Sequence, residues 1–241
     1  MAARLLLLVV LLLPSAFTQE LLVGAASDLS PLETPLRQVF EAHSGIRLRF
    51  TFGSSGMLAR QIRSGAPYDV YLSANEQFVQ ELAKDGLLRP DSVRAYASGR
   101  VGLWSASGQV RSVKDLTGAK IQHIAIPNPQ HAPYGVAAEQ ILRNEGVWEQ
   151  VRGKLVLAEN VRQAFEYART GNADAVLTSW TLLFDKGAIL LPDSEHAPIR
   201  QTGGVVKGTK NERAGRAFVE FLAGAEGRKL LARFGLFPPQ P

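Results

Sequence analysis

The chain of 241 residues contains no cysteine. This absence excludes disulfide bonds, thiolate metal ligands, a cysteine nucleophile and a lipid-modified cysteine anchor. Concentrated charge is missing too: 27 Lys and Arg stand against 22 Asp and Glu, a net charge of +5 without any basic run of five residues. Such a diffuse excess argues against a nucleic-acid-binding arm, so no nucleic-acid partner is expected.

One long apolar run is present, and it lies at the start of the chain. Arg4 precedes nine Leu and Val residues at 5–13, a run too short to span a bilayer as a helix. Signal peptidase sites carry small residues three positions and one position before the cleaved bond, and Ala16 and Thr18 fit a cleavage after residue 18. We therefore expect 1–18 to be a secretory signal peptide, removed on export to the periplasm. The alternative, a short membrane anchor, is disfavoured by the length of the run.

Strand-like and helix-like segments alternate along the rest of the chain. The segment 46–52 places apolar residues at every second position, as in a strand with one buried face. Strands are expected at 21–25, 46–52, 69–73, 100–104, 121–126, 154–157, 174–178 and 205–206, and helices at 31–43, 57–64, 76–85, 134–144, 161–170 and in two pieces within 213–234. This alternation predicts the α/β class, with mostly parallel sheets flanked by helices.

The order of these segments suggests two lobes. We expect 19–98 to form the first part of lobe 1, 99–198 to form lobe 2, and 199–241 to return to lobe 1. Two crossings between the lobes make a hinge, and two-lobed binding proteins close on a ligand about such a hinge.

Polar loops follow four of the expected strands, and each opens a helix. They lie at 25–28, 53–56, 128–135 and 159–163. Ligands of open α/β sheets sit beyond the carboxyl ends of the strands. Helix N-termini present free N–H groups there, at the positive end of the helix dipole. Several such ends together form an anion site without a buried Lys or Arg.

Each loop also has a plainer interpretation. Ser54 or Ser55 can be a simple N-cap. Asn160 is a cap in either case, with Gln163 three residues later as in a capping box. Tyr134 alone can be a core residue. The functional interpretation depends on all four loops occurring in order, each after a strand.

At these residues the chain resembles the periplasmic molybdate-binding proteins, the solute receptors of molybdate ABC importers. The matching motifs are Ala-Ala-Ser-Asp-Leu at 25–29, Gly-Ser-Ser-Gly at 53–56, Gly-Ala-Pro-Tyr-Asp-Val at 65–70, Asn-Pro-Gln-His-Ala-Pro-Tyr-Gly at 128–135, Glu-Asn-Val-Arg-Gln-Ala at 159–164 and Arg-Phe-Gly-Leu at 233–236. The resemblance implies a type II periplasmic binding fold, two α/β lobes with the cleft between them. It also implies a monomer that works with the membrane permease of an ABC transporter.

The resemblance further implies the residues that hold the oxyanion. They are Ser27, Asp28, Ser54 and Ser55, the backbone N–H groups of Tyr134 and Val161, and Thr178 or Ser179 in place of a tyrosine hydroxyl that some relatives carry. The ligand is molybdate or tungstate, with molybdenum bound only as molybdate. No cofactor and no catalytic residue is expected.

Asp28 departs from relatives that carry Ser or Asn at this position. A carboxylate aimed at a dianion in a dry cleft costs on the order of several kcal/mol. We therefore expect Asp28 to offer its backbone N–H and to turn its carboxylate towards neighbouring N–H groups or solvent. An inward carboxylate favours a protonated oxyanion such as hydrogen phosphate, whereas fully deprotonated molybdate and tungstate need donors only.

Two other functions compete with this one. A receptor for sulfate, phosphate or a small carboxylate is the first, with Arg60 or Arg162 as a carboxylate clamp. A serine-dependent hydrolase is the second, with Ser54 or Ser55 as nucleophile. The candidate bases are His43, His123, His131 and His196. The serines lack the Gly-x-Ser-x-Gly elbow of such enzymes, and the scattered histidines disfavour a metal receptor.

Overall fold

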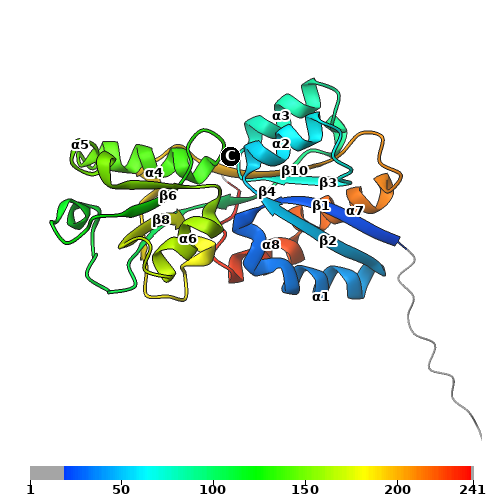
Figure 1. The fold of residues 1–241 in the computed structure, drawn as a ribbon. Helices are drawn as coiled ribbons and strands as arrows, with labels where there is room; N and C mark the ends of the chain where they lie inside the picture. The colour runs from blue at the N-terminus through cyan, green and yellow to red at the C-terminus, as the bar shows by residue number, and fades with distance from the viewer. Residues whose placement is uncertain (1–18, 240–241) are drawn as a thin grey trace, which may run out of the picture.

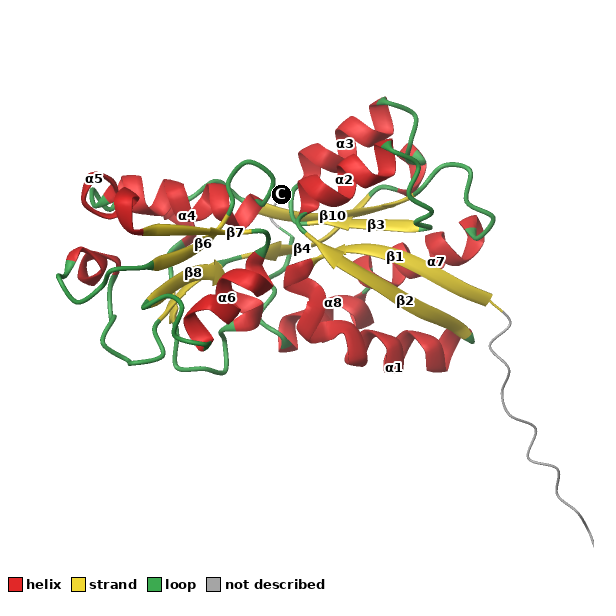
Figure 2. Cartoon of the chain, viewed as in Figure 1, coloured by secondary structure: helices red, strands yellow, loops and turns green. Residues whose placement is uncertain are grey.

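The computed structural model describes residues 19–239 and shows two five-stranded sheets lying side by side (Figure 1). Helices cover both faces of each sheet, so the predicted α/β class is confirmed (Figure 2). The signal peptide predicted at 1–18 lies outside the described residues. Within 19–239, none of the helices combines the length and the apolar character that crossing a membrane requires.

The first sheet has the strand order β2-β1-β3-β10-β4. Its strands are β1 (Gln19–Ala26), β2 (Ile46–Gly53), β3 (Val70–Ser73), β4 (Arg94–Gly99) and β10 (Ile199–Val205). Its helices are α1 (Glu33–Ser44), α2 (Ser55–Arg63), α3 (Glu76–Lys84), α7 (Glu212–Ala223) and α8 (Ala225–Arg233). A core of α1, α7 and α8 residues packs on one face, and a second core of α2 and α3 residues packs on the other.

The second sheet has the order β7-β6-β8-β5-β9. Its strands are β5 (Val101–Trp104), β6 (Ile124–Pro127), β7 (Leu155–Ala158), β8 (Ala175–Ser179) and β9 (Ile189–Leu190). The helices α4 (Pro133–Asn144) and α6 (Val161–Arg169) lie on opposite faces, with the short α5 (Trp148–Val151) following α4 (Figure 1). Short 3-10 helices at Ser27–Leu32 and Trp180–Leu182 follow β1 and β8.

Both sheets are mixed. The strands β1 and β6 pair in parallel with both neighbours, whereas β10 and β5 run antiparallel to both of theirs. The sequence predicted only 205–206 of β10 and missed β4 and β9. Gln201, Thr202 and two glycines break the apolar pattern of β10, although Gln201 and Thr202 are buried. The burial of Gln201 is explained by the site described below.

The chain passes from the first sheet to the second between β4 and β5, and it returns between β9 and β10. The lobe boundaries at 98/99 and 198/199 stay a prediction, which these crossing points support. The C-terminal segment adds a third connection. Phe237 exchanges two backbone hydrogen bonds with Ser98 at 2.8 and 2.9 Å. The Phe234 ring packs on Phe184, which follows the 3-10 helix Trp180–Leu182 after β8.

Candidate functional site

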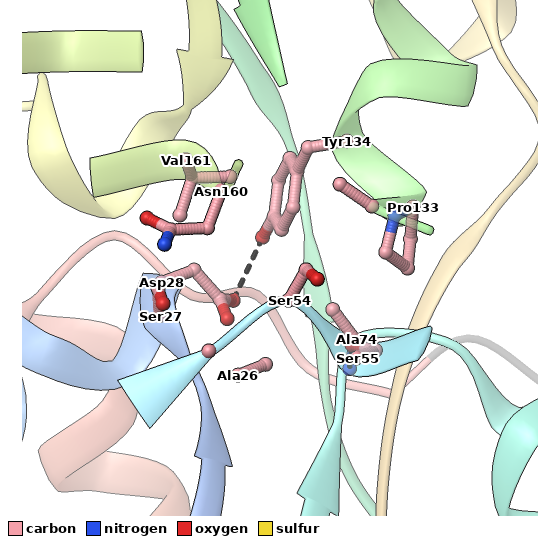
Figure 3. Close-up of a pocket in the computed structure, with 12 residues that line it drawn as sticks. Ala26, Ser27, Asp28, Ser54, Ser55, Ala74, Pro133, Tyr134, Asn160 and Val161 are labelled. Carbon is pink, nitrogen blue, oxygen red and sulfur yellow. Dashed lines mark hydrogen bonds between the residues drawn. The ribbon is translucent and has the colours of Figure 1, made fainter. Parts of the chain in front are cut away.

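A small cavity lies between the two sheets, where the carboxyl ends of β1, β2, β6 and β7 face one another (Figure 3). Its volume is small, about 10 Å³. Its lining residues are Ala26, Ser27, Asp28, Gly53, Ser54, Ser55, Ala74, Ala132, Pro133, Tyr134, Asn160 and Val161. The four polar loops recognised in the sequence therefore meet at one place, although they are far apart along the chain.

Helix N-termini surround this cavity. The helices α2, α4 and α6 begin at Ser55, Pro133 and Val161, all of which line it. The first-turn N–H groups of a helix have no carbonyl partner within that helix. The positive ends of three helix dipoles therefore point at the cavity. Among the lining residues of the described chain there is no Lys or Arg, so an anion here meets N–H groups and hydroxyls.

The serines are arranged as hydrogen-bond donors. The backbone N–H of Ala74 donates to Ser55 Oγ at 3.0 Å, which leaves the Ser55 hydroxyl proton for an acceptor in the cavity. Ser54 stands at the N-cap position of α2, yet its side chain makes no capping hydrogen bond. Its Oγ instead lies 2.8 Å from His131 Nδ1. The plainer interpretation of Ser54 as a helix cap is therefore wrong.

Asn160 does cap a helix. Its Oδ1 accepts the backbone N–H groups of Arg162 and Gln163 at 3.0 and 3.1 Å. In a capping box the Gln163 side chain would accept the backbone N–H of the N-cap residue, Asn160. Here Gln163 Oε1 accepts the Glu159 N–H instead. Arg60 and Arg162, the candidates for a carboxylate clamp, do not line the cavity.

The Asp28 carboxyl is buried between the sheets, with 1% of the residue exposed. Its Oδ2 accepts the Tyr134 hydroxyl at 2.9 Å (Figure 3). The same oxygen accepts the Gln201 amide at 2.5 Å. Burial raises the pKa of Asp28 to about 7, although these hydrogen bonds and the N–H groups of Asp28 and Leu29 lower it. The neighbouring N–H groups expected around the carboxyl therefore act on it, but the side chains that bond it come from distant parts of the sequence.

Tyr134 contributes more than the backbone N–H expected of it. Its side chain reaches from α4 to Asp28 and also lies 3.2 Å from Gln201 Nε2. Tyr96 on β4 donates to Gln201 Oε1 at 3.1 Å and extends the network. Sequence reasoning missed Gln201 and Tyr96. The signal that could have found Gln201 is an amide followed by Thr202 and two glycines in a segment that begins with Ile199 and ends with Val205.

Thr178 and Ser179 do not line the cavity. The Thr178 hydroxyl donates to the Val161 carbonyl at 2.9 Å. Ser179 Oγ accepts from Thr181 N at 3.3 Å, and it lies 2.9 Å from Thr181 Oγ1. The structure thus places neither hydroxyl where it can replace the tyrosine of some relatives.

His131 joins the two sides of the cavity. Its carbonyl accepts the Gly56 N–H at 2.9 Å, and its Nδ1 contacts Ser54. Glycine is needed at 56, because a Cβ there would lie 2.9 Å from that carbonyl oxygen. A second contact across the interface is the Thr181 hydroxyl, which donates to the Asp28 carbonyl at 2.7 Å. These bonds hold the structure with its two halves closed over the cavity.

Replacing His131 with alanine is expected to weaken ligand binding about 3- to 10-fold, mainly through faster dissociation, because a hydrogen bond across the interface is lost. Stopped-flow measurement of the dissociation rate tests this. His43→Ala is the control, since the exposed His43 ring bonds only within its own helix, to Val39 O at 2.8 Å. A dissociation rate unchanged by His131→Ala would remove the side chain from this role.

Of the four histidines considered as a catalytic base, the structure brings one to a candidate serine. His131 Nε2 also lies 3.7 Å from Glu159 Oε1. The ring of His196 bonds Ala197 O at 2.8 Å, and neither His43 nor His123 lines the cavity. Within 19–239 no three His, Asp or Glu side chains are grouped so as to hold a metal ion.

Two α/β halves with a small cavity between them are the architecture of a solute receptor. A family model described as bacterial extracellular solute-binding protein matches residues 21–237, and the chain belongs to this family.

Among its relatives are proteins named for one solute. The molybdate-binding protein ModA of Rhodobacter capsulatus is 30% identical over 97% of this chain and 94% of its own. ModA of Azotobacter vinelandii is 30% identical over 93% of this chain and 92% of its own. The solved structure of the Azotobacter vinelandii periplasmic molybdate-binding protein matches with a TM-score of 0.87 at 30% identity, covering 91% of this chain and 100% of that one. The resemblance seen in the sequence is confirmed.

Proposed function

We propose that the mature chain captures molybdate, and also tungstate, in the periplasm and delivers it to the membrane permease of an ABC importer. The observation that carries this proposal is the cavity between the two halves, which is lined by hydroxyls and helix N-termini and by no Lys or Arg. Relatives named for molybdate binding, similar over nearly the whole chain, supply the identity of the anion.

The proposed ligands of the anion are donors from both halves of the molecule. Ser27 and Ser55 offer hydroxyls from the first, and the backbone N–H groups of Tyr134 and Val161 offer hydrogens from the second. Because these groups are neutral, the empty site holds no unpaired cation. A smaller anion such as sulfate leaves donors unpaired, at roughly 1–3 kcal/mol each, and is disfavoured for that reason.

Closure of the halves links binding to transport. The anion bridges donors on both sides, so it stabilises the closed arrangement held by His131, Tyr134 and Thr181. The chain then presents one closed shape to the permease. We place the hinge at the two crossings near 98/99 and 198/199, and we take 1–18 as the signal peptide of a monomeric receptor. The anion is cargo, and no cofactor is required.

A receptor accounts for the Ser54–His131 contact better than a serine hydrolase does. The His131 ring and carbonyl both bridge the halves, and Glu159 is about half exposed, at 49% of its side chain, rather than held against the ring. A serine-directed phosphonate is expected to leave Ser54 unlabelled. Stoichiometric labelling would support the hydrolase instead.

Titration calorimetry on residues 19–241 with molybdate, tungstate, sulfate and phosphate tests the proposed function. We expect one anion per chain, with molybdate and tungstate bound roughly 100-fold more tightly than sulfate, as two unpaired donors would predict. A preference for sulfate or phosphate would establish the alternative receptor. The absence of heat with both molybdate and tungstate would rule out the proposal.

A further inference from the structure

Asp28 lines a cavity otherwise built from neutral donors, and half of its carboxyl is unused. Oδ2 accepts two hydrogen bonds, from Tyr134 and Gln201. Oδ1 is buried and makes no hydrogen bond of normal geometry, although the Asp28 and Leu29 N–H groups lie near the carboxyl. Buried polar atoms are nearly always paired, so an unpaired carboxyl oxygen at the edge of a ligand cavity points to a contact made with the ligand.

The side chains packed around this carboxyl cannot neutralise it. Tyr134 from α4 and Gln201 from β10 bond to it, and Tyr96 from β4 lies behind Gln201. Both tyrosines are neutral at physiological pH, because burial and the nearby Asp28 charge hold their pKa values well above the ordinary range.

The remaining elements around Asp28 present no cation either. The 3-10 helix Trp180–Leu182 offers the Thr181 hydroxyl, which bonds the Asp28 carbonyl. The start of α6 offers Asn160 and Val161, and the start of α2 offers two serines. One basic residue, His131, contacts the lining through its ring, at Ser54. An ionised Asp28 would therefore face a bound dianion with hydrogen-bond donors but no cation to offset the repulsion.

We propose that the Asp28 carboxyl takes up one proton from solvent when the oxyanion binds and donates it to the anion through Oδ1. This inference rests on the proposed function and adds to it a proton that enters with each anion. Its consequence is that the affinity of the site falls as pH rises through neutrality.

The proton balance is simple. In the open protein the carboxyl meets water and is ionised at neutral pH. On closure a hydronium ion or a buffer acid transfers its proton to Oδ1, forming one O–H bond. That hydrogen is shared with an oxygen of the fully deprotonated anion, while Oδ2 keeps its two donors. The carboxylate, the dianion and the proton together carry two negative charges, which the surrounding hydrogen-bond donors stabilise.

The direction of the pH effect follows from the raised pKa. In the closed chain the pKa of Asp28 is about 7, against an ordinary 3.8, and a neighbouring anion raises it further. A raised pKa stabilises the closed form. This stabilisation is complete at pH values below the ordinary pKa, and it is lost as the pH rises through the pKa of the closed form. Between these limits each bound anion takes up one proton, and affinity falls about tenfold per pH unit.

The first test uses the unaltered mature protein and molybdate. Calorimetry at pH 7 in buffers with different ionisation enthalpies counts the protons exchanged per anion, and the affinity is measured from pH 6 to pH 8. We expect an uptake that approaches one proton per anion. Because the affinity falls by up to about tenfold per pH unit, we expect it to fall about 10- to 100-fold between pH 6 and pH 8. Binding without proton uptake and with a flat pH profile would overturn the inference and leave the proposed function intact.

The second test is Asp28→Asn. Asparagine keeps the carboxyl shape, with an oxygen for Tyr134 and Gln201 and an NH₂ group in place of the protonated Oδ1. We expect the variant to bind molybdate with no proton uptake and with an affinity that changes less than about threefold between pH 6 and pH 8. Asp185→Asn, at an exposed carboxyl, is the matched control.

The outcomes separate the two claims. Proton uptake that persists in Asp28→Asn would assign the proton to another group and overturn the inference. Loss of folding in the variant, seen by circular dichroism, leaves the proton count of the unaltered protein as the deciding measurement. If the unaltered protein binds neither molybdate nor tungstate at any pH, the proposed function fails, and the inference fails with it.

Discussion

Replacing Ser55 with alanine is expected to weaken molybdate binding by about 10- to 100-fold. The reason is that a hydroxyl donating to a charged acceptor contributes about 1.5–3 kcal/mol, and each 1.4 kcal/mol is a factor of ten. In the structure Ser55 Oγ already accepts from Ala74 N, so its own hydrogen is free to be donated to the anion. Calorimetry with molybdate at constant pH measures the change.

Ser64→Ala is the matched control for this variant. Ser64 is exposed and follows α2 at its C-terminal end, whereas Ser55 begins the same helix inside the cavity. Urea unfolding should show a loss of about 1–3 kcal/mol for Ser55→Ala, because the Ala74 N–H loses its partner. An affinity equal to that of the unaltered protein would place Ser55 outside the site, whatever the change in stability.

Introducing a single methyl group at Gly99 is expected to weaken binding on the order of 100-fold, since overpacking at a tight contact costs about 1–3 kcal/mol. A Cβ at this position would lie 2.2 Å from the Tyr134 hydroxyl oxygen and 2.9 Å from its Cζ. The rigid tyrosine ring must move away, which breaks its hydrogen bond to Asp28. Because Gly99 ends β4 at the first crossing, the clash favours the open arrangement of the two halves.

Small-angle scattering and calorimetry together test the Gly99→Ala variant. We expect its radius of gyration to stay above that of the unaltered protein in saturating molybdate. Gly153→Ala is the control, because a Cβ at 153 meets nothing within 4 Å. If Gly99→Ala binds and closes like the control, the Tyr134 side chain does not govern closure.

The parts of the site that could be predicted from the sequence are those set by local signals. Each cavity loop follows an apolar strand and opens a helix, and the residues that cap or start a helix are chosen within a few positions. The Asn160 cap and the helix starts near Ser55 and Tyr134 are of this kind. Parallel strands then bring such loops to the same edge of a sheet, so their meeting could be predicted as well.

The parts that could not be predicted depend on contacts between distant segments. Gln201 and Tyr134 reach Asp28 across separations of 173 and 106 residues. The sequence suggested neighbouring N–H groups as partners of the Asp28 carboxyl, and it could not show that these distant side chains bond the same group. Strand β10 was largely missed because Gln201 and Thr202 look like surface residues, and only the packed structure shows that they are buried.

Thr178 and Ser179 illustrate the same limit at a smaller scale. The strand end at this place was predicted, and β8 does end at Ser179. The use of each hydroxyl, however, is decided by its nearest partner in space. The Val161 carbonyl takes one hydrogen, and Thr181 engages the other hydroxyl.

The most direct test of the central claim is anomalous diffraction at the molybdenum edge, from crystals of residues 19–241 grown with molybdate. The account predicts one strong molybdenum peak per chain, inside the cavity between Ser27, Ser55 and Val161, with the two halves closed over it. A cavity without a molybdenum peak in crystals soaked to saturation, or a peak only on the outer surface, would contradict it.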